Sequence, residues 1–573
     1  MYYNEKNLWQ VEQKGFDERY LGKSEATMAL GNGYFGSRSS EEEAYIGEKR
    51  DTFVAGTFNS FDENEVTELP NVPDMWGMEF VINDQRFSLT QGLVRNYSKR
   101  LNLKNGELSR EFIWELNDIK LKFIFQRFIS KKRQHLQVSH LELSNLTDRA
   151  VSIKIHSGIN GQVSNAGSQH FTDGEKGLMN GKFIQMMSMT THSKIQFVQT
   201  VEHKFDIRVS ERPETGRRAF FMNYNFELAA DSSFTVEKRG SVYTSIDNDL
   251  ESQDLNVIRK QAVHELENIE KLTYQELLTE SQLAWQQIWE KHPIKIDSEN
   301  FRDQLAIRFA KYHLHVMAPA HNEHMNIGAK GLSGRVTRDI HFGILKFSCC
   351  LILILHTQKL LKILSLIVIW DLTVRIKKQK SMDMKVPNIP GKQLILDEGS
   401  RSCLGSSRYC EWAVDKNLVR IIEQHITSDV AFGIKQYIDV TGDKVFEVEK
   451  AYEILIDTAK FWASRLEYIQ EDDSYEIRDV IGPDEYKEHV NNNAYTNYTA
   501  HWNVNFVIDL IQKLKSQKTD IYDKLDQKFN LNLLTENLSE KVDKIFLPKA
   551  TADRNYSQYM IYKNIRFAEI SRL

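Results

Sequence analysis

Cysteine and proline are both scarce in this chain, with 4 and 9 copies among 573 residues. So few cysteines exclude a disulfide-rich scaffold, and the scarcity of proline argues against long proline-rich linkers. The formal net charge is −5, so the chain lacks the basic excess that marks a nucleic-acid-binding protein. The four cysteines all lie between residues 349 and 410 with no CxxC spacing, so we expect no metal site.

Long apolar runs are also missing. The strongest candidate, residues 344–370, is broken by Lys346, His356, Lys359 and Lys362, which leaves no run of about 18 apolar residues. The N-terminus has no basic stretch followed by an apolar one, so no secretory signal is indicated. We therefore expect a cytoplasmic protein with no membrane partner.

Apolar residues make up 41% of the chain and charged residues 27%, as in ordinary globular proteins. The length suggests about two to four domains. Alternating apolar residues, such as Val151, Ile153 and Ile155, recur through residues 1–252 and predict strands. Helical stretches do not alternate with these strands, so we predict a large antiparallel sandwich rather than a parallel sheet.

Helical patterns begin after residue 252. Residues 253–293 are charged and predict a helical linker, with Trp285 and Trp289 four positions apart on one face. Two interpretations of this pair stay open: packing on the sandwich, or a stacking site for a ligand.

Residues 294–573 predict mainly amphipathic helices, which need neighbours to cover their apolar faces. One apolar stripe comprises Trp502, Phe506, Leu510 and Leu514. A helical toroid or bundle therefore follows the sandwich in the predicted α+β multidomain architecture.

The densest cluster of polar, loop-forming and aromatic residues is YEIRDVIGPDEYKEHVNNNAYTNYTAHWN, residues 475–503. Gly482-Pro483 breaks the helical pattern and places Asp484 and Glu485 on a loop. A carboxyl group that is buried near aromatic rings stays protonated near neutral pH, as acid catalysis at a glycosidic oxygen requires. The alternative is a solvated acidic loop that follows a helix end.

The stretch RDVIGPDEYKEHVNNNAYTNYTAHWN resembles the signature of the maltose, trehalose, kojibiose and nigerose phosphorylases, glycoside hydrolase family sixty-five. The Glu that follows Gly-Pro-Asp in that family is the general acid, and it corresponds to Glu485. Five further stretches agree in the same order: residues 28–43, 52–59, 324–334, 424–434 and 461–468. The resemblance implies an N-terminal super-β-sandwich, a helical linker, an (α/α)6 barrel that holds the active site and a small C-terminal β-domain.

The resemblance further implies reversible, inverting phosphorolysis of an α-linked glucose disaccharide of the maltose type. Phosphate attacks the anomeric carbon from the face opposite the leaving oxygen, the acid protonates that oxygen, and β-glucose 1-phosphate forms. Inverting hydrolases need a second carboxylate to activate water, whereas phosphate is already nucleophilic. Inorganic phosphate is then a co-substrate, and no cofactor is expected. A homodimer is a further expectation.

Arg478, His489 and Asn497 lie in the matched motif and are candidate contacts to the sugar; structural contacts at helix ends are the alternative. The disaccharide linkage stays open. Two other functions also stay open: a hydrolase of the same fold, such as an acid trehalase, and a non-catalytic carbohydrate-binding protein built on the sandwich.

The resemblance stops after Gly334 and returns at about Ile422, and a change of reading frame explains this gap. RDIHFGILK (338–346) can be encoded so that reading from the third nucleotide yields Gly-His-Ser-Phe-Trp-Asp-Thr-Glu, close to a family segment at this place. Residues 366–371 and 385–393 yield two further family segments in the same offset. We therefore hypothesise that residues 335–422 are translated out of frame, with a genuine insertion as the alternative.

The end of the chain also departs from the family. Residues 547–573 begin like the family and then drift, and the chain stops where family members continue for the rest of the barrel and the β-domain. The predicted domains are therefore a sandwich (1–252), a linker (253–293) and a scrambled, truncated and incomplete barrel (294–573). Positioning supplies much of an enzyme's rate, so we expect negligible phosphorylase activity from the chain as written.

Overall fold

A computed structural model describes residues 2–3 (backbone only), 7–60, 68–291, 293–322, 325, 327, 330–334, 422–483, 487–517 and 520–549. The chain divides into two compact units. The described part of the first unit ends at residue 334, and that of the second runs from residue 422 to 549. The predicted boundaries at residues 252 and 293 stay predictions.

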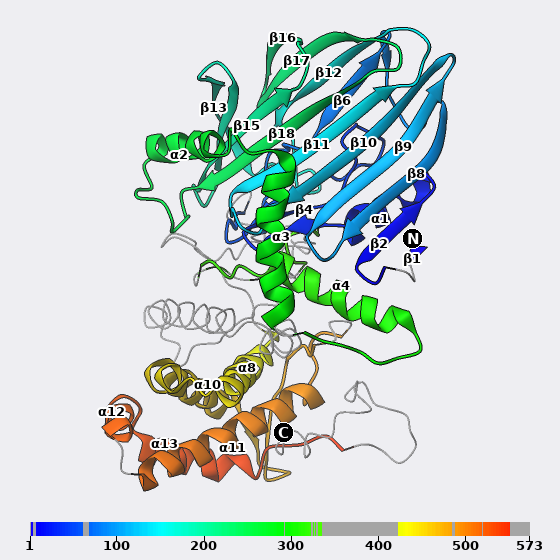
Figure 1. Ribbon diagram of the computed structural model, residues 1–573. Helices are drawn as coiled ribbons and strands as arrows, with labels where there is room; N and C mark the ends of the chain where they lie inside the picture. The colour runs from blue at the N-terminus through cyan, green and yellow to red at the C-terminus, as the bar shows by residue number, and fades with distance from the viewer. Residues whose placement is uncertain are drawn as a thin grey trace, which may run out of the picture. The chain divides into compact units, whose positions relative to one another are not determined.

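A ten-stranded antiparallel sheet forms one layer of the first unit (Figure 1). Its strands, in spatial order, are β1 (Tyr2–Tyr3), β2 (Gln10–Lys14), β8 (Leu93–Asn102), β9 (Glu107–Leu116), β10 (Ile119–Ile129), β11 (Leu136–Asn145), β18 (Ser233–Thr244), β15 (Gln196–Phe205), β14 (Phe183–Thr190) and β13 (Phe171–Met179).

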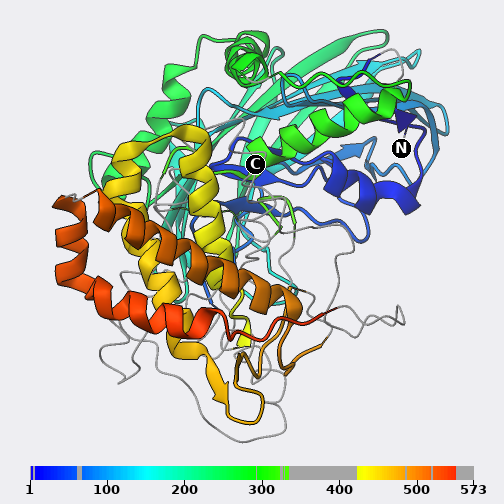
Figure 2. The ribbon, with the colours of Figure 1, turned by 90° about the horizontal axis from the view of Figure 1, so that it is seen from below.

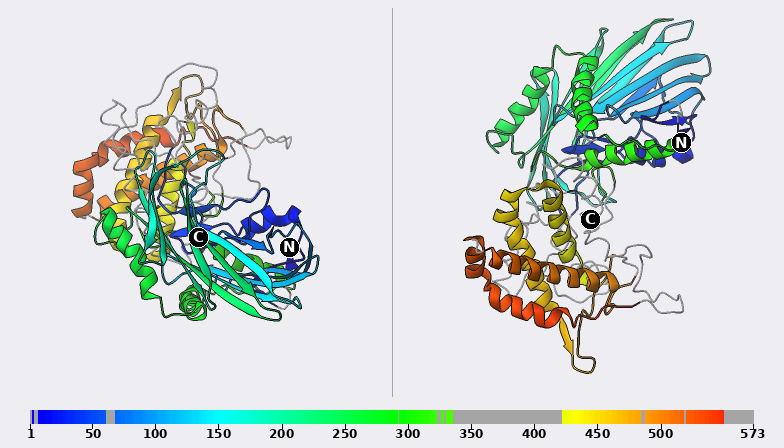
Figure 3. Two further views of the ribbon diagram at one scale, coloured as in Figure 1. Left: turned by 90° about the horizontal axis from the view of Figure 1, so that it is seen from above. Right: turned by 60° about the horizontal axis from the view of Figure 1, so that its bottom comes forward.

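A five-stranded antiparallel sheet forms the second layer, and Figure 3 shows the two sheets from two further directions. Its order is β16 (Ser210–Gly216), β17 (Ala219–Leu228), β12 (Val151–Asn160), β6 (Met78–Ile82) and β7 (Gln85–Arg86). A small three-stranded sheet contains β3 (Leu30–Gly31), β4 (Phe35–Ser37) and β5 (Thr52–Val54). The predicted antiparallel strands are confirmed.

Aromatic side chains fill the space between the layers. Phe123 of β10 pairs with Phe112 of β9, and their rings stack with centroids 5.1 Å apart. Phe80 of β6 contacts Phe123 edge-on at 5.7 Å, which joins the two sheets. Because alternate residues of a strand face the same side, the period-two pattern of the sequence places these rings in one core.

Three consecutive carboxylates, Glu41, Glu42 and Glu43, are buried in the first unit, although such a run reads as solvent-exposed sequence. The Arg110 guanidinium contacts all three, at 2.9, 2.6 and 2.6 Å. Lys99 lies 3.0 Å from Glu41, and Arg127 lies 3.1 Å from Glu42. Burial alone raises the pKa of Glu41, but Arg110 and Lys99 outweigh it and hold that pKa below its usual value.

Two helices that follow the sandwich pack on it, α2 (Leu255–Asn268) and α3 (Tyr274–Lys291). Trp285 of α3 is fully buried, and its indole nitrogen would lie 2.9 Å from a Cβ added at Gly106, between β8 and β9. It also stacks on Tyr312 of α4 (Phe301–Met317) at 5.1 Å. Packing is therefore the correct interpretation for Trp285. A short helix, α1 (Leu21–Thr27), preceded by the turn η1 (Glu18–Tyr20), completes the described helices of this unit.

The described part of the second unit is mainly helical (Figure 2). Its elements are α8 (Ile426–Thr441), α9 (Lys444–Phe446), η2 (Glu447–Ala451), α10 (Tyr452–Arg465), the hairpin β19 (Glu467–Ile469) and β20 (Ser474–Glu476), α11 (Ala494–Ser516), α12 (Asp520–Phe529) and α13 (Leu531–Val542). α11 contacts α8, α10, α12 and α13. The predicted closed (α/α)6 barrel stays a prediction, because residues 335–421 and 550–573 lie outside the described residues.

The buried face of α11 matches the predicted stripe in part, because Leu510 and Leu514 are buried. Val504 and Val507 are fully buried, whereas Trp502 and Phe506 are only half-buried and stack on each other at 5.8 Å. The large rings lie at the edge of the interface, where Phe432 and Lys435 of α8 cover them. No helix among the described residues is long and apolar enough to cross a membrane.

Candidate active site

The loop that connects β20 to α11 carries the predicted acid. Val480 and Val490 pair across it as an antiparallel bridge, with N–H to O distances of 2.9 and 2.8 Å. Asn492 donates its backbone N–H to the Ile477 carbonyl at 2.8 Å, and its side-chain oxygen accepts from Ile477 N at 3.2 Å. These contacts close the base of the loop on both sides of Glu485, which itself lies outside the described residues, as do Asp484 and Tyr486.

The backbone at Gly482 lies close to the start of α11, which leaves little room for a side chain at this position. A Cβ added at Gly482 would lie 2.4 Å from the side-chain nitrogen of Asn493. Asn493 is the N-cap of α11, and its Oδ1 accepts from the Thr496 backbone N–H at 3.1 Å. The glycine therefore lets the loop lie directly against the capped helix terminus.

Arg478 and His489 lie at the base of the loop. His489 Nδ1 is 2.5 Å from Asp479 Oδ1, across the two sides of the loop, and both residues have φ of +55°. Arg478 donates from Nε to Glu476 Oε2 at 2.7 Å, and its side chain remains 43% exposed. Both side chains are therefore near the predicted acid along the chain, and their contacts to a sugar stay predictions.

Asn497 is buried and makes hydrogen bonds within the protein. It is fully buried, and its side-chain N–H groups donate to the Phe546 carbonyl at 2.7 Å and to Asn492 Oδ1 at 3.1 Å. Beside it, Tyr475 N donates to the Lys544 carbonyl, and Phe546 N donates to the Tyr475 carbonyl, both at 2.8 Å. Asn497 therefore ties the loop to the segment after α13, as the alternative interpretation predicts; its contact with sugar stays a prediction.

The start of α8 supplies buried polar residues that the sequence did not place at the site. His425 Nδ1 donates to the Ile481 carbonyl at 3.3 Å, and Ile481 N donates to the Ile422 carbonyl at 3.1 Å. Burial lowers the pKa of His425 to about 4, so its ring is neutral at pH 7. A neutral ring that donates from Nδ1 has no proton on Nε2, which lies 4.0 Å from Asp429 Oδ2.

Tyr495 of α11 donates its hydroxyl to Asp429 of α8 at 2.6 Å, and Asp429 is fully buried. The side-chain oxygens of Thr427 and Ser428 and the amide of Asn503 are buried without a hydrogen-bond partner among the described residues. Buried polar groups normally have partners. These groups lie at the start of α8 and in the middle of α11, two helices that contact each other.

We expect Tyr495→Phe to lower the free energy of unfolding of the second unit by about 1–3 kcal/mol, because the buried Asp429 carboxylate loses a donor. Thermal denaturation monitored by circular dichroism measures this. Tyr498→Phe is the matched control on the same helix, since that hydroxyl donates to a neutral acceptor, the Pro548 carbonyl, at 3.2 Å. Equal losses in the two variants would contradict a special role for the Tyr495–Asp429 pair.

A possible metal-ligand group among the described residues comprises His135, Asp247 and Asp249 of the first unit. Each member is already hydrogen-bonded: His135 Nε2 lies 2.9 Å from Asp249, and its Nδ1 lies 2.7 Å from the Val242 carbonyl. Asp247 accepts from the Tyr34 hydroxyl at 2.9 Å and from the Thr244 hydroxyl at 2.7 Å. This group forms a satisfied hydrogen-bond network without an ion.

Comparisons with known proteins give consistent results. Residues 11–288 match the family described as glycosyl hydrolase family 65, N-terminal domain, and residues 308–571 match the glycosyl hydrolase family 65 central catalytic domain. A kojibiose phosphorylase of Halothermothrix orenii is 37% identical, covering 94% of this chain and 70% of the relative. The kojibiose phosphorylase of Escherichia coli is 30% identical, covering 88% of this chain and 66% of the relative.

A solved structure described as a putative kojibiose phosphorylase from the human microbiome matches with a TM-score of 0.78 and 20% identity. The match covers 94% of this chain and 70% of that chain. It supports the fold, namely a sheet-rich N-terminal part and a helical C-terminal part. The catalytic-domain match extends across residues 335–422 and therefore lends no support to out-of-frame translation, which stays a hypothesis outside the described residues.

Proposed function

This chain belongs to glycoside hydrolase family 65, and from that premise we propose that the reaction of its catalytic domain, once residues 335–422 and the C-terminus follow the family, is the inverting phosphorolysis of an α-linked glucose disaccharide. The products are β-glucose 1-phosphate and glucose. The relatives named above are disaccharide phosphorylases, which supports a glycosyltransferase-type reaction with a disaccharide and inorganic phosphate as substrates.

Glu485 is the proposed general acid. Its proton passes to the glycosidic oxygen as the bond from that oxygen to the anomeric carbon breaks, and a phosphate oxygen forms the new bond from the opposite face. Water is neither consumed nor released, and the acid regains its proton from the phosphate. One protein carboxyl group is sufficient, because phosphate needs no base to act as a nucleophile.

The observation that supports this assignment is the anchored loop. The Val480–Val490 bridge holds the two sides of the loop together, and His425 fixes Ile481 from α8. A loop that is fixed at its base restricts where a proton donor at its tip can lie, and orientation of reacting groups contributes strongly to rate. The family resemblance and the anchored base of the loop together support the proposal for Glu485.

The sequence and the comparisons point to different glycosidic linkages in the disaccharide. The sequence alone suggested a maltose-type substrate, whereas the two relatives compared above are named kojibiose phosphorylases. We therefore propose kojibiose as the first substrate to test, with maltose, nigerose and trehalose beside it.

The test is to incubate the purified chain with each disaccharide, with and without phosphate, and to measure glucose 1-phosphate and glucose. A phosphorylase yields one glucose 1-phosphate per glucose and needs phosphate, whereas a hydrolase yields two glucose molecules in phosphate-free buffer. A second version of the chain carries residues 335–422 restored to the family reading frame and a C-terminus extended as in the family. We expect turnover in the restored version and negligible turnover in the chain as printed; phosphate-independent cleavage by both would overturn the proposal.

A further inference from the structure

A cavity of about 550 Å3 lies in the first unit, separate from the loop that carries Glu485. The residues that line it come from the N-terminal segment, the turn between β8 and β9, the helices α3 and α4, and the connection between these helices. Its charged and aromatic lining residues include Trp9, Lys104, Trp289, Lys295, Arg308 and Lys311. Cavities of about 300–1,000 Å3 are the usual size for small-molecule sites.

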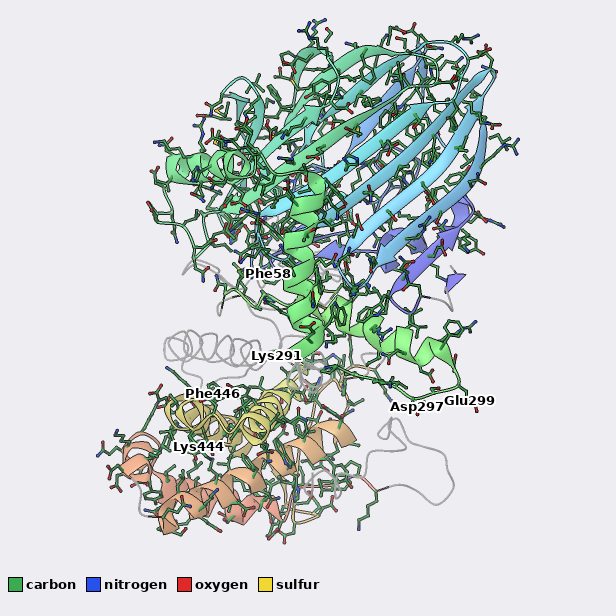
Figure 4. All side chains as sticks on the ribbon, in the orientation of Figure 1. Phe58, Lys291, Asp297, Glu299, Lys444 and Phe446 are labelled. Atoms are coloured by element: carbon green, nitrogen blue, oxygen red, sulfur yellow. The ribbon has the colours of Figure 1, made fainter. Side chains whose placement is uncertain are left out.

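The surface that lines this cavity is mainly apolar, and its charged side chains are mostly basic. It contains four basic side chains and a single acid, Glu290. Arg308 and Lys311 are three positions apart on α4 and therefore share a face of that helix. Asp297 and Glu299 do not line the cavity; Figure 4 shows them where α4 begins, away from Lys291 at the end of α3. The field inside the cavity is therefore positive and suits an anion.

Two indole rings in the lining contact two of its basic side chains. Trp9 and Trp289 meet edge to face, with centroids 4.9 Å apart and planes at 77°. The Arg308 guanidinium lies over the Trp9 ring at 4.0 Å, and Lys311 Nζ lies 5.1 Å from the Trp289 centroid. Each ring therefore has a cation over one face, and the Arg308 guanidinium also donates to the Leu8 carbonyl at 3.1 Å.

Lys311 adds a desolvated charge to the cavity. Its side chain is 3% exposed and donates to the Ile288 carbonyl at 3.3 Å. Burial lowers the pKa of Lys311 to about 8. A negative ligand in the cavity would offset this desolvation, because an opposite charge nearby favours the protonated amine.

We propose that this cavity binds a phosphate ester of a small polyol or sugar, at a site distinct from the Glu485 loop. A guanidinium forks onto phosphate oxygens, and lysines add point charges. The volume exceeds that of a bare phosphate ion and leaves room for an organic body. Inorganic phosphate shares the recognised chemistry, so the test includes it as a separate ligand. The proposal does not depend on the phosphorolysis proposed above.

The test titrates the full chain with glucose 6-phosphate, inorganic phosphate and glucose at low ionic strength, by calorimetry and by tryptophan fluorescence. The double variant Lys104→Gln/Lys295→Gln removes two exposed cations of the lining with little risk to folding. The matched control, Lys132→Gln/Lys271→Gln, removes two exposed lysines elsewhere in the first unit. Trp9→Phe tests whether the fluorescence change arises in this cavity.

We expect glucose 6-phosphate to bind the parent chain and the control equally, and at least about fivefold more weakly to the Lys104→Gln/Lys295→Gln variant, because surface charges steer and hold anions. Glucose is expected not to bind, and Trp9→Phe is expected to reduce the fluorescence change. Equal affinity of parent and lining variant would overturn the proposal. Equal affinity for inorganic phosphate and glucose 6-phosphate would overturn the ester assignment.

Discussion

Glu485→Gln is expected to lower the rate of phosphorolysis by about 10²–10⁴-fold, the usual contribution of a general acid. Glutamine has nearly the same shape but cannot deliver a proton to the leaving oxygen. The comparison is made in the version with residues 335–422 restored, where the proposed function predicts turnover. Glucose 1-phosphate release from kojibiose is the measured quantity.

A glucosyl donor whose leaving group needs no proton distinguishes the loss of acid catalysis from the loss of folded structure as the cause of a lower rate. α-Glucosyl fluoride loses fluoride without protonation, so Glu485→Gln is expected to retain most of its rate on this donor with phosphate as acceptor. Asp484→Asn, which removes the neighbouring carboxylate of the same loop, is the matched control and is expected to be affected much less. A Glu485→Gln variant as fast as the parent on kojibiose would remove the basis of the proposed mechanism.

Arg110→Met is expected to lower the stability of the sandwich by about 3–5 kcal/mol, because three buried carboxylates lose their shared cation. The corresponding fall in the thermal midpoint is about 6–20 °C for a domain of this size. Differential scanning calorimetry of the full chain measures the sandwich transition.

Arg86→Met is the matched control for this stability prediction. Arg86 also pairs with a glutamate, Glu79 at 3.0 Å, but its side chain is 65% exposed. Exposed pairs contribute at most about 1 kcal/mol, so the control is expected to melt close to the parent. If Arg110→Met and the parent melt at the same temperature, the buried ion pairs make no net contribution to the stability of the sandwich.

The same carboxylates predict how the stability of the sandwich depends on pH. The pKa of Glu41 is depressed in the folded state, so its ionised form favours folding above the usual glutamate pKa. This contribution is lost as the pH falls through the lower, folded-state pKa. We therefore expect the difference between the parent and Arg110→Met to shrink in acid.

Alternating apolar residues were sufficient to predict the sandwich. Val151, Ile153 and Ile155 are all buried on one face of β12, as the period of two requires. The run Glu41–Glu43 could not be predicted to be buried, because its partners Arg110 and Arg127 lie on strands far along the chain. Long-range charge pairing leaves no local signal in a sequence.

The candidate site was predictable only where a local motif exists. Gly482-Pro483 marked the loop, and the structure confirms a loop between β20 and α11. The contribution of His425 and Asp429 was missed, although the stretch 424–434 matched the family, because their partners Ile481 and Tyr495 belong to another segment. The signal available in the sequence was a polar residue, such as Asp429, at a helix position that is expected to be buried.

The contact between Asn497 and the Phe546 carbonyl has a consequence for biosynthesis. During translation the segment 475–497 leaves the ribosome well before Phe546 does, so the loop that carries Glu485 first emerges without one of its supports. We expect it to acquire its final shape only once the strand-like contact of Tyr475 with Lys544 and Phe546 has formed. Maturation of the site is thereby tied to completion of the chain beyond α13.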